Sequence, residues 1–419
     1  MNTIFVLLII LAFMLLIDLY FFQAIKTLIA DSSHVAKRIT TITYWMFSFV
    51  LSVGVIYVFL MNDRHGLGRV IILVAFGTVI SKVLGILFLF FDDIRRGVIW
   101  LVDNVFYGGG SKVSDVAESV VKKEDGISRN EFLTKSAVIS SLVPLAAMSY
   151  GIMSGAHDYR IRKRVITLPN LPSGFDGLRI AQISDIHSGS FFNKTAVEGG
   201  VEMLLDQKPD VVFFTGDLVN EDSDEVKDYT EIFKRVTAPL GVYSTLGNHD
   251  YGDYKRWPSE KAKAANLQKL KDAHEYMGWD LLNNENRILK ESGDSLAIVG
   301  VENWGLGFKK AGDLSKALKG TDEAAAKLLL SHDPSHWDAE VRPTSDVDIM
   351  FAGHTHGFQM GIEIGDFRWS PAQYRYKQWA DLYENNGQYL YVNRGYGYIG
   401  YPGRIGMPPE ITIIELKRG

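Results

Sequence analysis

The stretch that decides the fold is residues 180–187, IAQISDIH. The segment IAQIS predicts a buried strand, and this strand ends in Asp185 and His187. Because the two residues are two positions apart on an extended chain, their side chains fall on the same side. A carboxylate and an imidazole side by side at a strand end indicate the first half of a metal site.

The same pattern, an apolar strand that stops at a ligand-type residue, recurs four times further along the chain. The later segments are VVFFTGD with Asp217, VYSTLGNHD with Asn248, His249 and Asp250, KLLLSHD with His332, and DIMFAGHTH with His354 and His356. A single D-x-H or G-D pair occurs often by chance. Five motifs in this order, each after an apolar strand, predict one metal site built from all of them.

Length and composition narrow the class of protein. A chain of 419 residues is expected to form more than one domain. The net charge of −5 shows no basic excess, which argues against nucleic-acid binding. The sequence has no cysteine, so disulfides and thiolate metal sites are excluded. Any metal must bind oxygen and imidazole ligands, which suit Mn, Fe, Zn or Mg.

The first 155 residues are far more apolar than the rest and predict a transmembrane helical region. Four apolar runs have roughly the length of a membrane span, at residues 3–22, 44–61, 70–91 and 136–153. Two charged residues, Asp18 and Lys82, fall inside spans and are functional candidates for that reason. The favoured alternative is that they pair with each other. The second domain is expected at residues 156–419.

Lysine and arginine in the connections predict the orientation in the membrane. The first connection holds Lys26, Lys37 and Arg38, and the third holds Arg95, Arg96, Lys112, Lys122, Lys123 and Arg129, whereas the second holds only Arg64 and Arg69. The positive-inside rule then puts the first and third connections in the cytoplasm and residues after 153 on the outer face. Arg160, Arg162, Lys163 and Arg164 argue for the opposite orientation.

Beyond residue 156 the chain alternates strand-like and helix-like runs, which predicts parallel sheet with helices outside. We expect Asn193 to cap one of these helices and Pro258 to lie in the first turn of another. The strand-rich later part predicts a second or mixed sheet. Ligand-type residues cluster where strands end, which is where open α/β sheets place their sites.

The five motifs resemble those of the calcineurin-like metallophosphoesterases, over about residues 178–416. The order of segments further resembles bacterial members that carry spanning helices before the catalytic domain. The resemblance implies an α/β fold, the αββα sandwich, in which two mixed sheets lie face to face with helices outside. It also implies a bacterial inner-membrane protein, and the positive-inside rule puts its catalytic domain on the outer, periplasmic face.

Carried over to this sequence, the resemblance implies two divalent metal ions. The first would be held by Asp185, His187, Asp217 and His356, and the second by Asp217, Asn248, His332 and His354. Asp217 would bridge the two. Such a pair of metals clamps the attacking and leaving oxygens of a phosphoryl group, and a metal-bridged hydroxide attacks phosphorus in line.

The resemblance also implies roles for residues that are not ligands. His249 would stabilise the charge that develops on phosphorus or protonate the leaving oxygen. Asp250 would fix the tautomer of His249, or else form a turn or helix cap. Asn220 stands where many relatives have a further Asp, so no metal is assigned to it. Arg404 is expected either to reach a substrate phosphate or to be a plain structural arginine.

Three further features have less specific interpretations. His336, four residues after His332, is expected on a helix face rather than in the metal site. Residues 395–400, GYGYIG, match a dinucleotide-binding pattern but are followed by YPG instead of a helix, which predicts an irregular loop near the site. An aromatic-rich region predicts mainly core packing, with some side chains lining a cleft or touching headgroups, and it contains Trp369, Tyr374, Tyr376, Trp379, Tyr396, Tyr398 and Tyr401.

The predicted function is a membrane-anchored phosphoester hydrolase, either a phosphatase or a phosphodiesterase. Its substrate is a phosphoester, and the membrane anchor suggests a lipid headgroup or an envelope component. The alternative is a non-catalytic metal-binding membrane sensor with a degenerate site. A metallopeptidase would need an H-E-x-x-H helix, and a transporter would need more spans or an internal repeat; the sequence shows neither feature.

Overall fold

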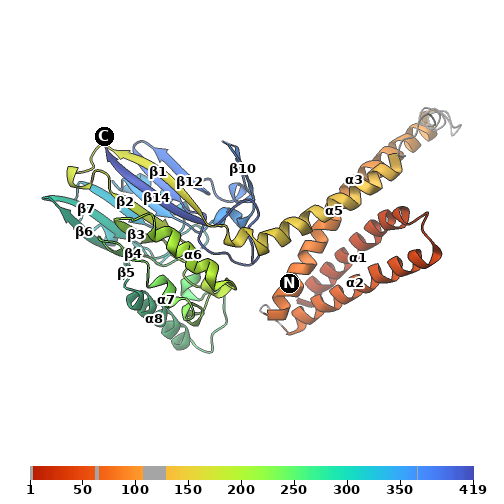
Figure 1. Ribbon diagram of the computed structural model, residues 1–419, viewed down its shortest axis with the longest axis horizontal. Helices are drawn as coiled ribbons and strands as arrows, with labels where there is room; N and C mark the ends of the chain where they lie inside the picture. The colour runs from red at the N-terminus through yellow and green to blue at the C-terminus, as the bar shows by residue number, and fades with distance from the viewer. Residues whose placement is uncertain (1–2, 62–65, 107–128, 366) are drawn as a thin grey trace. The chain divides into compact units, whose positions relative to one another are not determined.

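The computed structural model describes residues 3–61, 66–106, 129–365 and 367–419 of the chain (Figure 1). The chain divides into two compact units, Met1–Ser149 and Tyr150–Gly419. The first unit is helical and the second contains all of the described strands. The domain boundary expected between residues 155 and 156 stays a prediction.

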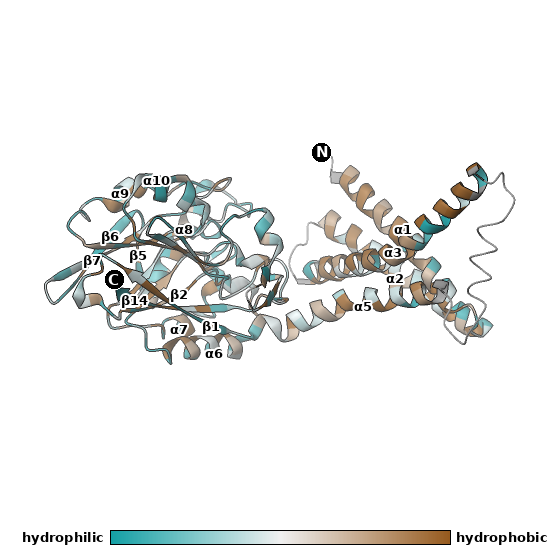
Figure 2. Cartoon of the chain, turned by 90° about the horizontal axis from the view of Figure 1, so that it is seen from above, coloured by the Kyte–Doolittle hydropathy of each residue, from teal (hydrophilic) through white to brown (hydrophobic). Residues whose placement is uncertain are grey.

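Four long helices make up the membrane region, as the four apolar runs predict. They are α1 (Thr3–Leu28), α2 (His34–Met61), α3 (Gly66–Phe106) and α5 (Arg129–Met153). Each is long and apolar enough to cross a membrane, and hydrophobic colours run along them in Figure 2. The last turn of α5, residues 150–153, belongs to the second unit.

Helix α3 is longer than the predicted span, because it continues through residues that were expected in the third connection. Arg95 and Arg96 pair with Asp92 and Asp93 three or four positions earlier. Pairs at this spacing lie on one helix face and favour continuation of the helix. Lys112, Lys122 and Lys123 of the same connection, and Arg64 of the second, lie outside the described residues.

The two charges inside the spans form an ion pair, which confirms that interpretation. The Lys82 ammonium contacts the Asp18 carboxylate, and both side chains are buried. The Ser48 hydroxyl also donates to Asp18, and the Tyr44 hydroxyl donates to the Asp18 carbonyl oxygen at 2.9 Å. The Lys82 ammonium lies 4.7 Å from the centre of the Tyr44 ring. The charges therefore compensate each other inside the first unit.

The second unit is built on two six-stranded sheets of mixed direction. The first runs in the order β1 (Arg160–Leu168), β14 (Glu410–Arg418), β2 (Arg179–Ile183), β3 (Val211–Phe214), β4 (Val242–Ser244), β5 (Asp280–Leu281). The second runs in the order β12 (Asp381–Asn385), β13 (Gln388–Val392), β9 (Ile349–Ala352), β8 (Ala326–Leu330), β7 (Asp294–Gly300), β6 (Glu285–Glu291). A separate hairpin pairs β10 (Ile362–Ile364) with β11 (Phe367–Trp369).

The helices of this unit follow the strands and range from 3 to 18 residues in length. They are α6 (Lys194–Leu205), α7 (Thr230–Phe233), α8 (Glu260–Met277), α9 (Leu314–Leu318) and α10 (Arg342–Thr344), with a π-helical turn η6 (Trp337–Val341) before the last. Single 3-10 turns are η1 (Gly155–His157), η2 (Ser173–Phe175), η3 (Ser188–Ser190), η4 (Ser223–Val226), η5 (His249–Tyr251), η7 (His356–Gln359) and η8 (Pro371–Tyr374).

One of the two predicted helix starts is correct. The Asn193 side chain accepts a hydrogen bond from the Ala196 backbone N–H and caps α6. Helix α8 instead begins at Glu260 with Ser259 as its cap, so the prediction that Pro258 lies in the first turn is wrong. The physical reason is that the Ser259 hydroxyl supplies the N-terminal hydrogen bond that proline cannot.

Three buried apolar layers show that the unit is the predicted αββα sandwich. The middle layer joins the two sheets and includes Ile180, Phe213, Leu328 and Phe351. A second layer packs the first sheet against residues of α6, α7 and α8. A third packs the other face of the second sheet against α9 and η6. Figure 1 shows α6, α7 and α8 beside strands of the first sheet.

We predict that breaking the buried ion pair of the membrane region destabilises the protein. Asp18→Asn leaves the Lys82 ammonium without its counter-charge, which costs about 3–5 kcal/mol for a buried pair. Adding Lys82→Met should recover most of the loss, since both charges are then gone. The measurement is thermal unfolding of the full chain in detergent, with Asp31→Asn in the exposed first connection as control. Equal melting temperatures for Asp18→Asn and Asp31→Asn would contradict the idea.

Candidate metal centre

Five strands from the two sheets end at one place, and their last residues carry the predicted ligands. Asp185 and His187 follow β2, Asp217 follows β3, Asn248 follows β4, His332 follows β8, and His354 and His356 follow β9. The structure brings six of these side chains into two groups whose ligand atoms lie within 4.8 Å of one another. One group is Asp185, His187 and His356, and the other is Asp217, His332 and His354.

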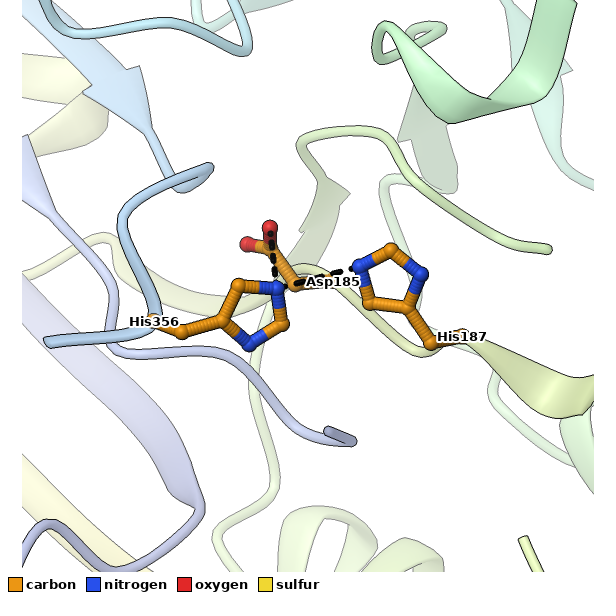
Figure 3. Close-up of side chains that lie close together, drawn as sticks. All are labelled: Asp185, His187 and His356. Carbon is orange, nitrogen blue, oxygen red and sulfur yellow. Dashed lines mark hydrogen bonds and ion pairs between the residues drawn. The ribbon is translucent and has the colours of Figure 1, made fainter. Parts of the chain in front are cut away.

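The first group joins the loop after β2 to the loop after β9. The Nε2 atoms of His187 and His356 are 3.0 Å apart, and His356 Nε2 lies 3.3 Å from Asp185 Oδ1. Figure 3 shows the three side chains pointing toward one another, with His356 on a different segment from the other two. All three are buried.

The second group is centred on the Asp217 carboxylate. Its Oδ2 atom lies 3.1 Å from His332 Nε2, and His354 Nδ1 lies 3.2 Å from the same nitrogen. The Asp217 Oδ2 atom is also 3.6 Å from His187 Nε2 of the first group. One carboxylate oxygen therefore contacts imidazoles of both groups, which is the position that a bridging ligand needs.

Asn248, the seventh predicted ligand, carries an unsatisfied acceptor. Its Oδ1 atom is buried and has no hydrogen-bond donor among the described residues, while its Nδ2 donates to the Tyr254 hydroxyl at 2.9 Å. The next residue, His249, donates its backbone N–H to Asp217 Oδ1 at 2.9 Å. A buried acceptor without a donor is costly, and a cation beside it removes the cost. The carboxylate, amide and imidazole atoms gathered at this site are ligands that suit a divalent cation.

Burial and charge prepare the imidazoles to act as ligands. Burial lowers the pKa of His187 to about 3 and that of His354 to about 4, so both rings are neutral near pH 7. Burial opposes ionisation of Asp217, but His332 and His249 hold the pKa of this carboxyl well below its ordinary value. Burial also lowers the pKa of His332, but the negative charge of Asp217 outweighs the effect of burial. The pKa of His332 is therefore raised to about 10. Metal binding at His332 would therefore release a proton.

The backbone at the ligands is strained. Left-handed φ values occur at Asp185 (51°), His187 (49°), Asp217 (62°), His354 (69°) and His356 (53°). Non-glycine residues seldom adopt this region, at a cost of about 1–3 kcal/mol each, and such residues cluster at functional sites. Five of the seven predicted ligands thus have a left-handed backbone conformation.

Glycines beside the ligands leave room for the carboxylates. A Cβ atom on Gly247 would lie 2.2 Å from Asp217 Oδ1, and one on Gly353 would lie 2.2 Å from Asp185 Oδ2. No side chain fits at either position. The glycines of the G-N-H-D and G-H-x-H motifs are therefore part of the metal site.

Comparison with known proteins agrees with this geometry. Residues 178–358 match the family model described as "Calcineurin-like phosphoesterase", and residues 1–156 match "Probable Calcineurin-like phosphoesterase, transmembrane domain". Residues 178–358 are thus a calcineurin-like phosphoesterase domain, and residues 1–156 match the transmembrane domain described with it. The expected resemblance is confirmed, and the family explains why metal-ligand residues gather at these strand ends.

Individual relatives are distant. The chain is 27% identical over 299 residues to a "Transmembrane protein with metallophosphoesterase domain" of Danio rerio, covering 70% of this chain and 65% of that protein. It is 28% identical over 253 residues to the "Uncharacterized metallophosphoesterase YkuE" of Bacillus subtilis, covering 59% of this chain and 82% of that protein. The chain thus spans less than two thirds of the Danio rerio relative. A solved phosphopantetheinyl hydrolase of Mycobacterium tuberculosis aligns with a TM-score of 0.31 and 16% identity, over 52% of this chain and 88% of that one.

His249 of the phosphoesterase domain lies at the site, but Asp250 does not orient it. His249 Nδ1 lies 2.7 Å from the Asn220 carbonyl oxygen, and its ring is 5.0 Å from that of His187. The Asp250 carboxylate instead accepts hydrogen bonds from four backbone N–H groups, those of Asp217, Leu218, Val219 and Gly247. The expectation that Asp250 fixes the tautomer of His249 is wrong, because these backbone donors take up its oxygens.

Arg404 does not reach toward a substrate, which corrects the first of its two expected roles. Its side chain is buried beneath His356, with Nη2 3.3 Å from His356 Nδ1. The guanidinium donates to backbone carbonyls, including Gly397 from Nε at 2.9 Å, Met407 from Nη1 at 3.1 Å and Arg394 from Nη2 at 2.8 Å. Arg404 supports the loop under the ligands.

The glycine-rich segment 395–400 is an irregular loop against the site, as expected. Tyr396 and Gly397 donate their backbone N–H groups to the Ser184 and Asp185 carbonyl oxygens, at 2.7 and 2.9 Å. The segment holds the loop after β2 in place and opens no helix.

Three side chains near the ligands were not among the predicted site residues, and one of them, Tyr376, was expected only as part of the aromatic-rich region. The Tyr376 hydroxyl lies 2.7 Å from His354 Nε2, and Asp333 Oδ2 lies 3.5 Å from the same nitrogen. The ring of Tyr254 is tilted against that of His249, with the ring centres 4.6 Å apart. Asp333 directly follows the motif residue His332, so its place near the site could have been predicted. Tyr376 and Tyr254 lie in loops, and no motif indicates the course of those loops. His336 lies outside both ligand groups; its ring stacks on Trp304 and its Nε2 contacts Glu340.

We predict that Asp217→Asn removes most of the tightly bound divalent metal from the full-length protein. The amide lacks the charge that Asp217 presents to histidines of both groups, so neither cation would be held well. The measurement is elemental analysis of the purified chain after dialysis. The control is Asp224→Asn, an exposed carboxylate paired with nearby Lys227. Equal metal content in the two variants would contradict the role of Asp217.

Proposed function

We propose that the chain is a membrane-anchored hydrolase of phosphate esters that holds two divalent cations, drawn from Mn, Fe, Zn or Mg. The first would bind Asp185, His187, Asp217 and His356, and the second Asp217, Asn248, His332 and His354. The observation that carries the proposal is the Asp217 Oδ2 atom, which lies 3.1 Å from His332 Nε2 and 3.6 Å from His187 Nε2.

Two cations bound there would activate water and neutralise charge on a phosphoryl group. The protein supplies the surroundings. Asp185 and Asp217 are buried carboxylates, and the neutral imidazoles add no negative charge that would repel an anionic substrate. His249 is half-buried and keeps Nδ1 on the Asn220 carbonyl oxygen, which directs Nε2 toward the site. Because Nδ1–H is donated to that carbonyl, Nε2 carries a proton only in the imidazolium form, and that form would donate it to the charge on phosphorus or to the leaving oxygen.

The membrane anchor suggests where the substrate lies. Four spanning helices in the same chain keep the phosphoesterase domain at a bilayer surface. A lipid headgroup or another envelope phosphoester is therefore the favoured substrate class. The net charge of −5 gives no reason to expect a nucleic-acid ligand.

We further propose that the protein resides in the bacterial cell membrane with its catalytic domain on the outer face. Lys26 in the last turn of α1, and Lys37 and Arg38 near the start of α2, flank the first connection and support this orientation. The arginines after the fourth span belong to a folded domain of the chain: Arg162 contacts Glu363 and Arg164 pairs with Asp381. Charges within a long domain count less toward orientation than those in short loops.

We predict metal-dependent hydrolysis by the full-length chain in detergent. The metal is stripped, Mn, Fe, Zn or Mg is added back, and turnover of an aryl phosphate monoester and diester is followed. His249→Asn should retain metal and lower kcat by about 100-fold or more, the usual contribution of a general acid. Asp217→Asn should lose both metal and turnover.

The outcomes separate the proposal from its rival. Unchanged turnover in both variants, with Asp224→Asn as the matched control, would overturn the assigned roles. Metal bound in full amount with no turnover of either ester would favour the non-catalytic sensor.

We predict that a thiol on the catalytic domain reacts from the outside of intact cells. The natural sequence has no cysteine, so Lys290→Cys on the exposed part of β6 provides a single reporter. In a bacterial expression host, a membrane-impermeant maleimide should label it without lysis. A second single-cysteine variant, Ser33→Cys in the first connection, should be labelled only after lysis. The reverse pattern would place the catalytic domain in the cytoplasm.

A further inference from the structure

The β10–β11 hairpin has two chemically opposite faces. Its register pairs Ile362 with Trp369, Ile364 with Phe367, and Glu363 with Arg368. Directly paired residues of an antiparallel ribbon lie on the same face, and successive pairs alternate. One face therefore carries four apolar side chains, and the other carries an acid and a base.

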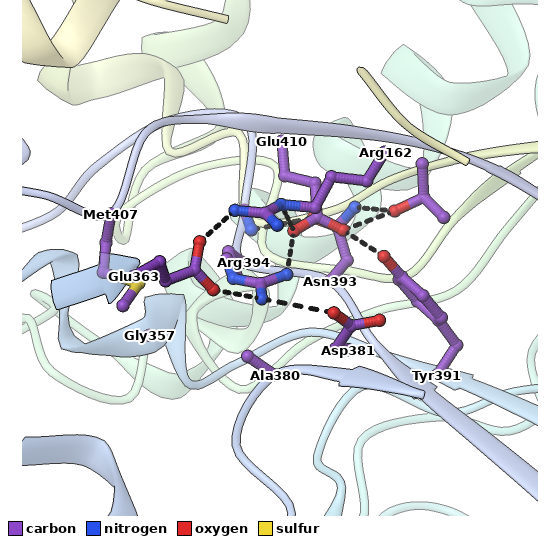
Figure 4. Close-up of polar contacts among 12 residues, drawn as sticks. Arg162, Gly357, Glu363, Ala380, Asp381, Tyr391, Asn393, Arg394, Met407 and Glu410 are labelled. Carbon is purple, nitrogen blue, oxygen red and sulfur yellow. Dashed lines mark hydrogen bonds and ion pairs between the residues drawn. The ribbon is translucent and has the colours of Figure 1, made fainter. Parts of the chain in front are cut away.

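The polar face is tied to a buried network of charges (Figure 4). Glu363 accepts from the buried Arg394 at 2.6 Å and also contacts Arg162. Arg394 donates in turn to Glu410 at 2.6 Å, and neither of these side chains is exposed. Arg368 donates to Asp381 at 3.1 Å.

Breaking such a network leaves a buried charge without its partner, which is costly in free energy. The hairpin is therefore held in one orientation by its polar face. Its apolar face has no freedom to fold back onto the domain.

That apolar face is exposed. Ile364 and Phe367 are 73% and 60% exposed, and Tyr374, whose hydroxyl lies 3.4 Å from Trp369 Nε1, is 78% exposed. Ile362 and Phe358 at the base of the hairpin are exposed as well. A contiguous apolar surface of this kind marks an interaction site.

A short segment of the chain connects the hairpin to the last turn of α5, the fourth apolar helix. Its base lies on residues 401–406: Gly361 donates its backbone N–H to the Ile405 carbonyl oxygen at 2.9 Å. The same short segment holds the last turn of α5, since Arg404 donates its N–H to the Gly151 carbonyl oxygen at 3.1 Å. A Cβ atom on Gly155 would lie 2.0 Å from the Arg404 carbonyl oxygen, so the contact is close. One six-residue segment thus joins the hairpin to the end of the fourth spanning helix.

We infer that the apolar face of the β10–β11 hairpin lies in the headgroup boundary of the bilayer that α5 crosses. Its partner is the lipid surface itself. Aromatic side chains such as Trp369 and Tyr374 suit this boundary, because their rings enter it and their polar atoms stay hydrated. Apolar faces at this depth lie about 5–10 Å inside the headgroup layer. The inference does not depend on the proposed hydrolase activity.

The test uses an environment-sensitive fluorophore on a single cysteine in the full-length chain. The chain has no cysteine of its own, so Ile364→Cys and, separately, Phe367→Cys each give one label. Both positions are exposed, so the substitutions leave the fold intact. The control is Lys290→Cys on β6, at the edge of the second sheet opposite β12. Each labelled protein is placed in nanodiscs of ordinary phospholipid or of phospholipid brominated on its upper acyl carbons.

At 364 and 367 we expect blue-shifted emission that brominated lipid reduces by roughly half, since labels at about 5–10 Å depth lie near the bromines. At 290 we expect water-like emission and no effect of bromine. Equal emission at 364 and 290, with quenching by aqueous iodide at both, would overturn the inference. A blue shift at 364 without quenching by brominated lipid would also overturn it, because a second copy of the chain then covers the face. No readout involves turnover, so an inactive enzyme leaves the test unaffected.

Discussion

The second unit depends on keeping the Asp217 carboxylate ionised while it is fully buried. An isolated buried charge costs several kcal/mol, so it must be surrounded by compensating groups. His332 stands 3.1 Å away, and the His249 backbone N–H donates to the other oxygen at 2.9 Å. Asp250 fastens the surrounding loops by accepting N–H bonds from Asp217 and Gly247. Two sheets must therefore end at the same place, because the compensating groups come from both.

The same constraint explains why so much of the site could be predicted from the sequence. Each ligand follows a buried strand. An apolar strand that ends at Asp, Asn or His can be recognised in the amino-acid sequence without the structure. Two glycines of the motifs have a related explanation. Gly247 and Gly353 lie against carboxylate oxygens, so no residue with a side chain fits at either position. Fold class and ligand candidates thus follow from local patterns.

What could not be predicted depends on contacts between distant segments. Asp250 is adjacent to His249 in sequence, yet its carboxylate faces the backbone of the loop after β3. Arg404 looks like a rim residue because its neighbours are glycines and prolines, yet it lies buried under His356. Local spacing carries no information on which way such side chains point. The hairpin's polar face is a similar case, since Glu363 meets Arg162 across about two hundred residues of chain.

The buried arginines connect the hairpin to the metal centre. Arg404 contacts His356 Nδ1 at 3.3 Å and donates to the Arg394 carbonyl oxygen at 2.8 Å. The side chain of Arg394 then reaches Glu363 at 2.6 Å. Hydrogen bonds thus run without a break from a candidate ligand to the strand proposed to lie in the headgroup layer. The last turn of α5, which belongs to the same unit, is held by the same Arg404 segment. In the proposed arrangement, these contacts tie the candidate ligand His356 to a strand at the bilayer surface, which is one reason for proposing a lipid or envelope phosphoester as the substrate.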